Sequence, residues 1–297
     1  MGEWRAVIDI GTNSVLLLLA RRGSDGALEV ARDQSTITRL GQGAAATGLL
    51  APEAIARTLA CLQEYRQTAQ AHGAEITAVT TEGVRMASNQ GAFLGPAGEV
   101  LGRPVRLLSG AEEAELSYLS VARETPEGGP LRVLDIGGGS TELVVGDGLQ
   151  VLTAVSHPVG AVRLTERLIS ADPPTPEMLA AVHAAALATF QARSPVAPHP
   201  VLHALAGTAT TTAALLLGLP TYDRMRVDGS RFSRAAVAGL RDVLAGETLA
   251  QRCTRPSLER GRADVIVAGV TILLAALEHC GAERLVVRDR GLRYALV

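Results

Sequence analysis

The stretch Asp9-Ile10-Gly11-Thr12-Asn13-Ser14 returns 126 residues later as Asp135-Ile136-Gly137-Gly138-Gly139-Ser140. Both hexapeptides have the pattern D-I-G-x-x-S. Each lies among three predicted strands in the same arrangement: Trp4–Ile10, Val15–Ala20 and Ala27–Ser35 around the first copy, and Leu131–Ile136, Thr141–Val145 and Leu149–Val155 around the second. One hexapeptide would be weak support, but two copies in the same setting predict a duplicated domain.

The length and composition agree with two folded domains. The chain has 297 residues, about twice the usual size of one domain, and 47% of them are hydrophobic. Helical patterns alternate with the strands, which predicts an α/β fold. The stretch Arg123–Pro130 is polar and rich in Gly and Pro, so it is the best candidate for a linker. We therefore expect one domain over residues 1–124 and a second over residues 125–297.

The composition excludes several classes of function. Aromatic residues make up only 3% of the chain, which argues against a nucleic-acid binder that stacks bases on aromatic rings. All 28 basic residues are Arg, which excludes a Walker A loop and a lysine Schiff base. The formal net charge of −2 offers no global attraction to a polyanion, so such a ligand must be held by local chemistry.

The cysteines and the chain start indicate a cytoplasmic protein. Cys61, Cys253 and Cys280 show neither disulfide nor metal-site spacing. Met1–Ile10 lacks the layout of a signal peptide, and the longest apolar runs are too short or too interrupted to span a bilayer. We expect no membrane partner, and a homodimer stays open.

Both hexapeptides are predicted turns between two strands, with the backbone N–H groups of small residues available to an anion. Phosphate would contact Gly11, Thr12, Asn13 and Ser14 in the first loop, and Gly137, Gly138, Gly139, Ser140 and Thr141 in the second. Asp9 and Asp135 would repel phosphate unless a divalent cation or a water lies between. The alternative is that each Asp only closes its own turn. The pairing of the two loops favours phosphate.

A third turn of small residues, Gly207-Thr208-Ala209-Thr210, enters a predicted helix. The backbone amides of Gly207 and Thr208, together with the helix dipole, could bind another phosphate. An ordinary helix N-terminus explains the same residues nearly as well.

The acidic run Glu112-Glu113-Ala114-Glu115 contains one carboxylate that local structure does not explain. Ser109 and Glu112 match a capping box, which predicts a helix from there to about Val121. Glu115 fits a surface position. Glu113 shares a helix face with Ser117 and Ser120, a small polar surface suited to a cleft, where a carboxylate can orient or deprotonate an attacking water. Without the loops, it would be taken for a solvated charge.

Two arginines are candidates for gripping phosphate through parallel hydrogen bonds. Arg85 follows a predicted strand at Thr80–Val84, and Arg39 precedes Leu40-Gly41. A surface Arg is the default interpretation of each.

Over nearly its whole length, the chain resembles the exopolyphosphatase/guanosine pentaphosphate phosphohydrolase (Ppx/GppA) family of the actin-like superfamily. The resemblance rests on these segments: Asp9–Ser14, Arg39–Gly41, Thr47–Ile55, Ser109–Leu116, Asp135–Leu143, Gly160–Glu166, Gly207–Thr211, Gly261–Ile266 and Asp289–Gly291. It implies two duplicated actin-like, ribonuclease H-like domains around an interdomain cleft.

The resemblance also implies a reaction and its residues. The family hydrolyses terminal phosphates from inorganic polyphosphate or guanosine pentaphosphate, usually with Mg²⁺. Its catalytic Glu falls on Glu113, its phosphate-binding Arg on Arg85, and its phosphate- and metal-binding loop on Asp135, Gly137–Thr141 and Glu142. We expect Asp135, Glu142 and Asp9 to hold the divalent cation.

The chain departs from the family pattern at three places. Leu16 stands where members often carry a basic residue, and Ala206-Gly207-Thr208 replaces Gly-Gly-Thr. The chain stops soon after Arg290-Gly291, so it resembles the short, two-domain type, for which we expect a weaker grip on long chains. Two other functions stay open: an actin-fold ATPase or kinase, and a sensor that binds guanosine penta- or tetraphosphate without hydrolysing it.

Overall fold

The computed structural model describes residues 2–24, 26–125 and 128–297 and divides the chain into two compact units. Unit 1 comprises Met1–Leu116 together with Leu292–Val297, and unit 2 comprises Ser117–Gly291. The division falls inside helix α5 (Gly110–Ala122), whereas the sequence predicts a boundary at residue 124. Pro126 and Glu127 of the predicted linker lie outside the described residues. Each unit is described below by itself.

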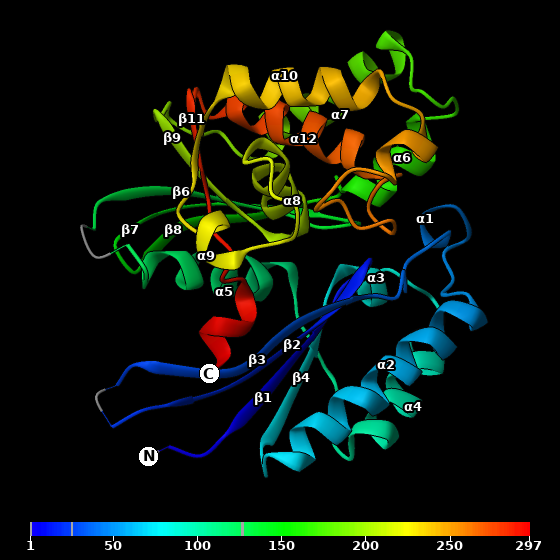
Figure 1. The fold of residues 1–297 in the computed structure, drawn as a ribbon, viewed down its shortest axis with the longest axis vertical. Coiled ribbons are helices and arrows are strands. Elements are labelled where there is room, and N and C mark those ends of the chain that lie inside the picture. Colours follow the sequence, from blue (N-terminus) through cyan, green and yellow to red (C-terminus); the bar gives the residue numbers. More distant parts are fainter. Residues whose placement is uncertain (1, 25, 126–127) are drawn as a thin grey trace. The chain divides into compact units, whose positions relative to one another are not determined.

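Unit 1 is built on a five-stranded mixed sheet (Figure 1). The strand order is β3-β2-β1-β4-β5, where β1 pairs antiparallel with β2 and parallel with β4. The bounds are β1 Arg5–Ile10, β2 Ser14–Arg22, β3 Leu28–Ile37, β4 Glu75–Thr80 and β5 Arg106–Leu107. The loop Gly11–Asn13 therefore joins two adjacent antiparallel strands, as the sequence predicts.

Unit 2 repeats this topology. Its sheet has the order β10-β11-β9-β6-β7-β8, with β6–β7 and β7–β8 antiparallel and β6–β9 and β9–β11 parallel. The bounds are β6 Pro130–Ile136, β7 Thr141–Asp147, β8 Gln150–His157, β9 Val201–Leu205, β10 Arg231–Ser233 and β11 Arg284–Val287. Strands β8-β7-β6-β9-β11 match β3-β2-β1-β4-β5 in order and direction, which confirms the duplicated α/β fold. The added antiparallel edge strand β10 was not predicted from the sequence.

The helices of unit 1 bury one face of its sheet. α2 (Pro52–Ala71) and α4 (Gly91–Leu101) lie side by side along the strands (Figure 1), where Leu62 and Phe93 pack with Ile8 and Leu17 in one apolar cluster. Unit 1 also contains two short helices, α1 (Ala44–Thr47) and α3 (Glu82–Arg85). The predicted strand at Thr80–Val84 is wrong, because β4 ends at Thr80 and the N–H groups of Val84 and Arg85 donate to the Thr81 carbonyl to form α3.

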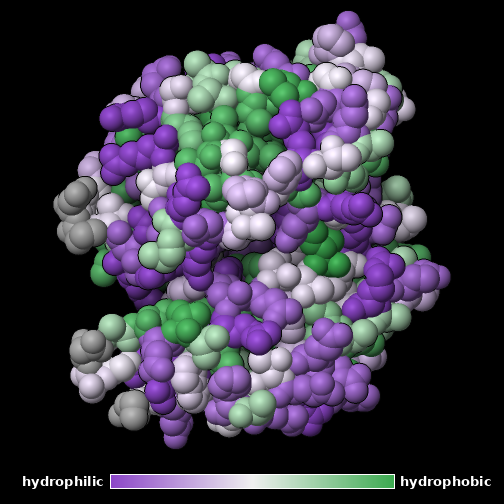
Figure 2. Space-filling view, viewed as in Figure 1, coloured by the Kyte–Doolittle hydropathy of each residue, from purple (hydrophilic) through white to green (hydrophobic). Residues whose placement is uncertain are grey.

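Unit 2 encloses a helix that is apolar over most of its length. Every residue of α12 (Ile266–His279) from Ile266 to Leu277 is buried, as expected of a helix that is hydrophobic all round. Figure 2 shows hydrophobic residues gathered where Figure 1 draws α10, α12 and β11, on a face that is otherwise mostly hydrophilic or intermediate. The other helices are α6 Ala161–Leu168, α7 Pro176–Arg193, α8 Ala206–Leu216, α9 Arg224–Val227, α10 Arg234–Ala245 and α11 Leu249–Arg252. In the described ranges, no helix is both long and apolar enough to cross a membrane.

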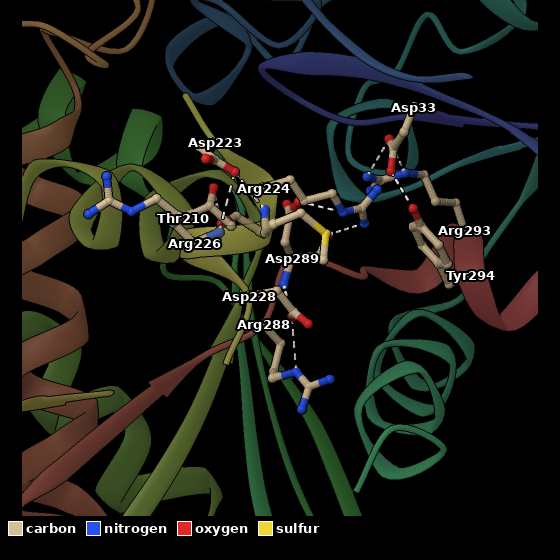
Figure 3. A network of polar contacts seen from close by, with 12 residues as sticks. Asp33, Thr210, Asp223, Arg224, Arg226, Asp228, Arg288, Asp289, Arg293 and Tyr294 are labelled. Carbon is tan, nitrogen blue, oxygen red and sulfur yellow. Dashed lines mark hydrogen bonds and ion pairs between the residues drawn. The ribbon is translucent and has the colours of Figure 1, made fainter. Parts of the chain in front are cut away.

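The end of the chain belongs to unit 1. The 3-10 helix η1 (Leu292–Leu296) places Tyr294 in a cluster with Val7 and Leu18. The Arg293 guanidinium donates to Asp33 Oδ1 through Nη2 at 2.8 Å, and the Tyr294 hydroxyl contacts the same carboxylate (Figure 3). This partly buried ion pair and the apolar contacts attach residues 292–297 to the first sheet.

Candidate functional site

The second loop is held through its carbonyl groups. The Gly137 carbonyl accepts from the Ala161 N–H at 3.0 Å, and the Gly138 carbonyl accepts from the N–H groups of Val162 and Arg163 at 2.9 and 3.0 Å. The Gly139 carbonyl accepts from the Nε of Arg163 at 2.8 Å. The N-terminal turn of α6 and one of its side chains thus bind three successive loop carbonyls.

This pairing fixes where the loop amides point. The peptide bonds of the loop are trans, so each carbonyl and the N–H of the next residue point in opposite directions. Because the carbonyls of residues 137–139 point toward α6, the N–H groups of Gly138, Gly139 and Ser140 point away from it. Three successive N–H groups aimed to one side form a surface suited to a phosphate group.

Two further contacts shape this loop. A Cβ atom on Gly160 would lie 2.4 Å from the Gly138 carbonyl oxygen, so only glycine lets α6 approach so closely. The Thr141 hydroxyl donates to the Val159 carbonyl at 2.6 Å and is fully buried. The only hydrogen of this hydroxyl is therefore used to hold the loop, although Thr141 is among the phosphate contacts predicted from the sequence.

The first loop has the same arrangement with a different support. The Thr12 carbonyl accepts from the Gly41 N–H at 2.9 Å, and the Asn13 carbonyl accepts from the N–H groups of Thr38 and Arg39. The N–H groups of Asn13 and Ser14 therefore point away from the segment 38–41. In both loops, the N–H of the first Gly closes the turn on the carbonyl of the Ser at 2.9 Å.

The Thr12 side chain is packed between two glycines of unit 1. A Cβ on Gly41 would lie 2.3 Å from Thr12 Cγ2, and a Cβ on Gly83 would lie 2.8 Å from Thr12 Oγ1. Gly83 belongs to α3, which also carries Arg85. The first loop and α3 are therefore in direct contact.

Asp135 and Glu142 are paired carboxylates in unit 2. They are cross-strand neighbours on β6 and β7, which places both side chains on one face of the sheet. Ser117 Oγ donates to Asp135 Oδ2 at 2.7 Å, and Ser156 Oγ donates to Glu142 Oε1 at 2.7 Å. Each carboxylate is buried, with 9% and 1% of the residue exposed respectively. Such ionisable groups rarely lie so deep without hydrogen bonds and a cationic partner.

This pair fits a magnesium ion, which proteins usually hold through one or two carboxylates while phosphate oxygens and waters complete the octahedron. Over the described ranges, no group of three or more His, Cys, Asp or Glu side chains could hold a metal by itself. In unit 1, the cross-strand neighbour of Asp9 is Leu16, so that position offers one carboxylate instead of two.

Glu113 is the buried member of its acidic run. The Ser109 N–H and hydroxyl donate to Glu112 Oε2 at 2.9 and 2.8 Å, and the Glu112 N–H donates to Ser109 Oγ, so the predicted capping box is confirmed. These hydrogen bonds lower the pKa of the Glu112 carboxyl. Glu115 is exposed, whereas only 8% of Glu113 is exposed.

Arg85 contacts Glu113 and also supports the backbone beside it. Its Nη1 donates to the Leu108 carbonyl at 2.7 Å and lies 3.4 Å from Glu113 Oε2. The Arg85 side chain is 23% exposed. One edge of the guanidinium is thus used within unit 1, and the rest of the group can meet a charged ligand.

The third loop lies at the start of α8. The helix begins at Ala206, and its N-cap residue, Leu205, makes no side-chain cap, so the amides of the first turn depend on other partners. A Cβ on Gly207 would lie 1.6 Å from the Arg262 Nη1, which shows that this guanidinium lies directly over Gly207. Thr208 contacts Gly269 of α12.

The second and third loops leave the same edge of the sheet. β6 and β9 are parallel neighbours with Asp135 opposite Leu205, so Gly137 and Ala206 follow adjacent strand ends. Ligands of α/β sheets bind at such carboxyl edges. No sequence pattern predicts these roles of Arg163 and Arg262, because each reaches its loop from a segment distant along the chain.

Asp289, in the motif Asp289-Arg290-Gly291, makes an ion pair within unit 2. Its Oδ2 lies 2.9 Å from Arg224 Nε, and the neighbouring Arg288 pairs with Asp228 at 3.1 Å (Figure 3). These pairs join the end of β11 to α9.

The predicted site residues divide between the units. Unit 1 brings together Asp9, Gly11–Ser14, Arg85 and Glu113 through β1, the contact of Thr12 with α3, and the contact of Arg85 with α5. Unit 2 brings together Asp135, Gly137–Thr141, Glu142, Gly207 and Thr208 at one sheet edge.

Comparisons with known proteins show what the whole chain is similar to. A family model described as the Ppx/GppA phosphatase family matches residues 20–297. Exopolyphosphatase 2 of Mycobacterium tuberculosis is 35% identical over 304 residues, which cover 97% of this chain and 95% of the relative.

Solved structures resemble the whole chain. A crystal structure of the Aquifex aeolicus member of the Ppx/GppA protein family has a TM-score of 0.84 and 33% identity, covering 99% of this chain and 96% of that one. A crystal structure of an exopolyphosphatase-like protein has a TM-score of 0.92 and 30% identity, covering 99% and 97%.

Proposed function

The chain belongs to the Ppx/GppA phosphatase family, and we propose from this premise that it is an exopolyphosphatase, which hydrolyses the terminal phosphoanhydride bond of inorganic polyphosphate and releases orthophosphate. The observation that carries the proposal is the second loop. Three of its N–H groups point to one side because α6 binds the intervening carbonyls. Such a surface binds phosphate groups without reading any base or sugar.

Glu113 is the proposed general base. Its carboxylate is not used in capping, is the buried one of its run, and lies beside a guanidinium that can hold a phosphate group. It would accept a proton from the attacking water as the water oxygen bonds to the terminal phosphorus, while the P–O bond to the remaining chain breaks. Arg85 would bind phosphate oxygens and keep Glu113 in place.

The phosphate contacts are proposed for backbone amides and cations. Asn13 and Ser14 in unit 1, and Gly138, Gly139 and Ser140 in unit 2, would donate their N–H groups. The first turn of α8 and Arg262 would provide a further positive region in unit 2.

Asp135 and Glu142 are the proposed ligands of a divalent cation, with Ser117 and Ser156 holding their orientation. A bound Mg²⁺ would offset the negative charge of the phosphates and polarise the bond that breaks. Asp9 stays a predicted ligand, and a cytoplasmic location and a homodimer stay predictions.

Release of orthophosphate by the purified protein with Mg²⁺ tests the proposal. Long polyphosphate, tripolyphosphate, guanosine pentaphosphate and ATP would be compared at equal concentrations of terminal phosphate. We expect release from long polyphosphate in the absence of any nucleotide. Release of orthophosphate only from ATP would indicate an ATPase, and binding of guanosine pentaphosphate without release would indicate a sensor.

A further inference from the structure

The three outward N–H groups of the second loop do not have equal support. The peptides joining residues 137–138 and 138–139 are held by main-chain donors of α6, which no substitution removes directly. The peptide joining Gly139 to Ser140 is held by the side chain of Arg163, whose Nε donates to the Gly139 carbonyl. The direction of the Ser140 N–H therefore depends on one side chain.

We propose that Arg163 is a positioning residue for phosphate binding, because it fixes the Gly139–Ser140 peptide with the Ser140 N–H directed at the phosphate. The inference rests on the proposed function of the loop. Without this hydrogen bond, the peptide could rotate, since Gly139 imposes little restriction on its own backbone. Rotation would present a carbonyl oxygen where an N–H is needed, and phosphate would be repelled.

The surroundings of the loop show why a side chain is needed at this point. Gly160 lets the backbone of α6 reach Gly138, and the first three N–H groups of the helix are used on Gly137 and Gly138. The next carbonyl, that of Gly139, accepts from the Arg163 side chain of the same helix. The planar guanidinium keeps its Nε–H aligned with that carbonyl.

The Gly139–Ser140 peptide directly precedes the strand that carries a proposed cation ligand. Ser140 immediately precedes β7, which carries Glu142, and Ser140 is 4% exposed. The peptide fixed by Arg163 is therefore followed, two residues along the chain, by one of the two proposed cation ligands.

Affinity for tripolyphosphate, measured by calorimetry with Mg²⁺ in the Glu113→Gln background, tests this role without turnover. Arg163→Met removes the donor and the charge, Arg163→Lys keeps the charge and a flexible donor, and Arg167→Met, on an exposed position of the same helix, is the matched control. A hydrogen bond to a charged group contributes about 1.5–3 kcal/mol, so we expect the dissociation constant to rise about 10- to 100-fold in Arg163→Met. Arg163→Lys should recover part of this loss, and Arg167→Met should change nothing.

Two measurements separate positioning from simple destabilisation. The melting temperature of each variant should change little, and amide exchange of residues 137–141 should quicken in Arg163→Met while the rest of unit 2 keeps its protection. A dissociation constant within twofold of the parent in Arg163→Met would overturn the inference. If that variant does not fold, Arg163→Lys decides, and parental affinity there would overturn it.

The proposed function and the role of Arg163 are refuted by different results. Absence of phosphate release by the unsubstituted protein would refute hydrolysis, whereas the tripolyphosphate affinities of the Arg163 series would still test the loop.

Discussion

Asp135 and Glu142 face each other across β6 and β7, whereas the equivalent partner of Asp9 in unit 1 is Leu16. The two sheets share a topology, so this difference lies in one residue of the repeat. It gives unit 2 two carboxylates at the end of its central hairpin and unit 1 only one. The proposed cation would therefore be bound beside the second loop.

Glu142→Gln should weaken cation binding. The amide oxygen can still accept from Ser156 Oγ, so the local fold is kept while the negative charge is lost. Loss of an outer-shell partner lowers metal affinity about 10–100-fold, so loss of a direct ligand should cost at least about tenfold. Titrating phosphate release with Mg²⁺, and Mn²⁺ binding by electron paramagnetic resonance, would measure it.

Asp147→Asn is the matched control, because Asp147 lies exposed at the other end of the same strand. Equal cation affinities in the two variants would contradict the assignment of Glu142.

Glu113→Gln should lower kcat by about 10²–10⁴-fold, the usual contribution of a general base. The neutral amide cannot accept the proton from water, but it can still contact Arg85. Glu115→Gln, on an exposed position of the same helix, should leave kcat unchanged. Steady-state phosphate release from polyphosphate would measure both, and parental turnover in Glu113→Gln would remove its proposed role.

Gly207→Ala should raise KM for polyphosphate about tenfold, with little change in melting temperature. The new methyl group would occupy the place of the Arg262 guanidinium, which can swing away at small cost because it ends a flexible side chain. The third loop would then lose a charged hydrogen-bond donor.

Gly239→Ala, in the middle of α10, has no atom within 4 Å of the added Cβ and serves as the control. It should keep KM and stabilise the protein slightly, by about 0.5–1 kcal/mol. An unchanged KM in Gly207→Ala would show that Arg262 does not contribute to binding.

Acid should destabilise unit 2 through His157. Burial, followed by the nearby charges of Arg193 and His279, lowers the pKa of His157 from 6.5 to about 4. Because the folded value lies below the unfolded one, this stability is present above pH 6.5 and is lost as the pH falls toward 4. One such group costs about 2 kcal/mol at pH 5.

Urea unfolding at pH 7 and pH 5 would measure this effect. The loss between the two should be about 2 kcal/mol smaller in His157→Gln than in the parent. His72→Gln, at an exposed position, should keep the parental loss. Equal losses in all three proteins would contradict the buried neutral state of His157.

Local patterns sufficed for much of the fold. The strands around both hexapeptides were predicted because their apolar runs end at turn residues, and the repeat predicted that the two sheets would share a topology. The capping box of Ser109 and Glu112 lies within one helical turn, so the sequence also showed which glutamate of the acidic run is used for capping. The strand predicted at Thr80–Val84 is wrong because a helical turn follows β4. The N–H groups of Val84 and Arg85 donate to the Thr81 carbonyl and form α3.

The sequence by itself determined the duplication, the small-residue loops at the strand ends, and the choice of Glu113 as the carboxylate that local structure does not explain. Each of these depends on neighbours along the chain. Only the tertiary structure decided which way the loop amides point, that the Thr141 hydroxyl is used internally, and that Arg163 and Arg262 reach the second and third loops. Each of these depends on a donor or acceptor from a distant segment, and hydrogen bonds between distant segments exist only once packing brings those segments together.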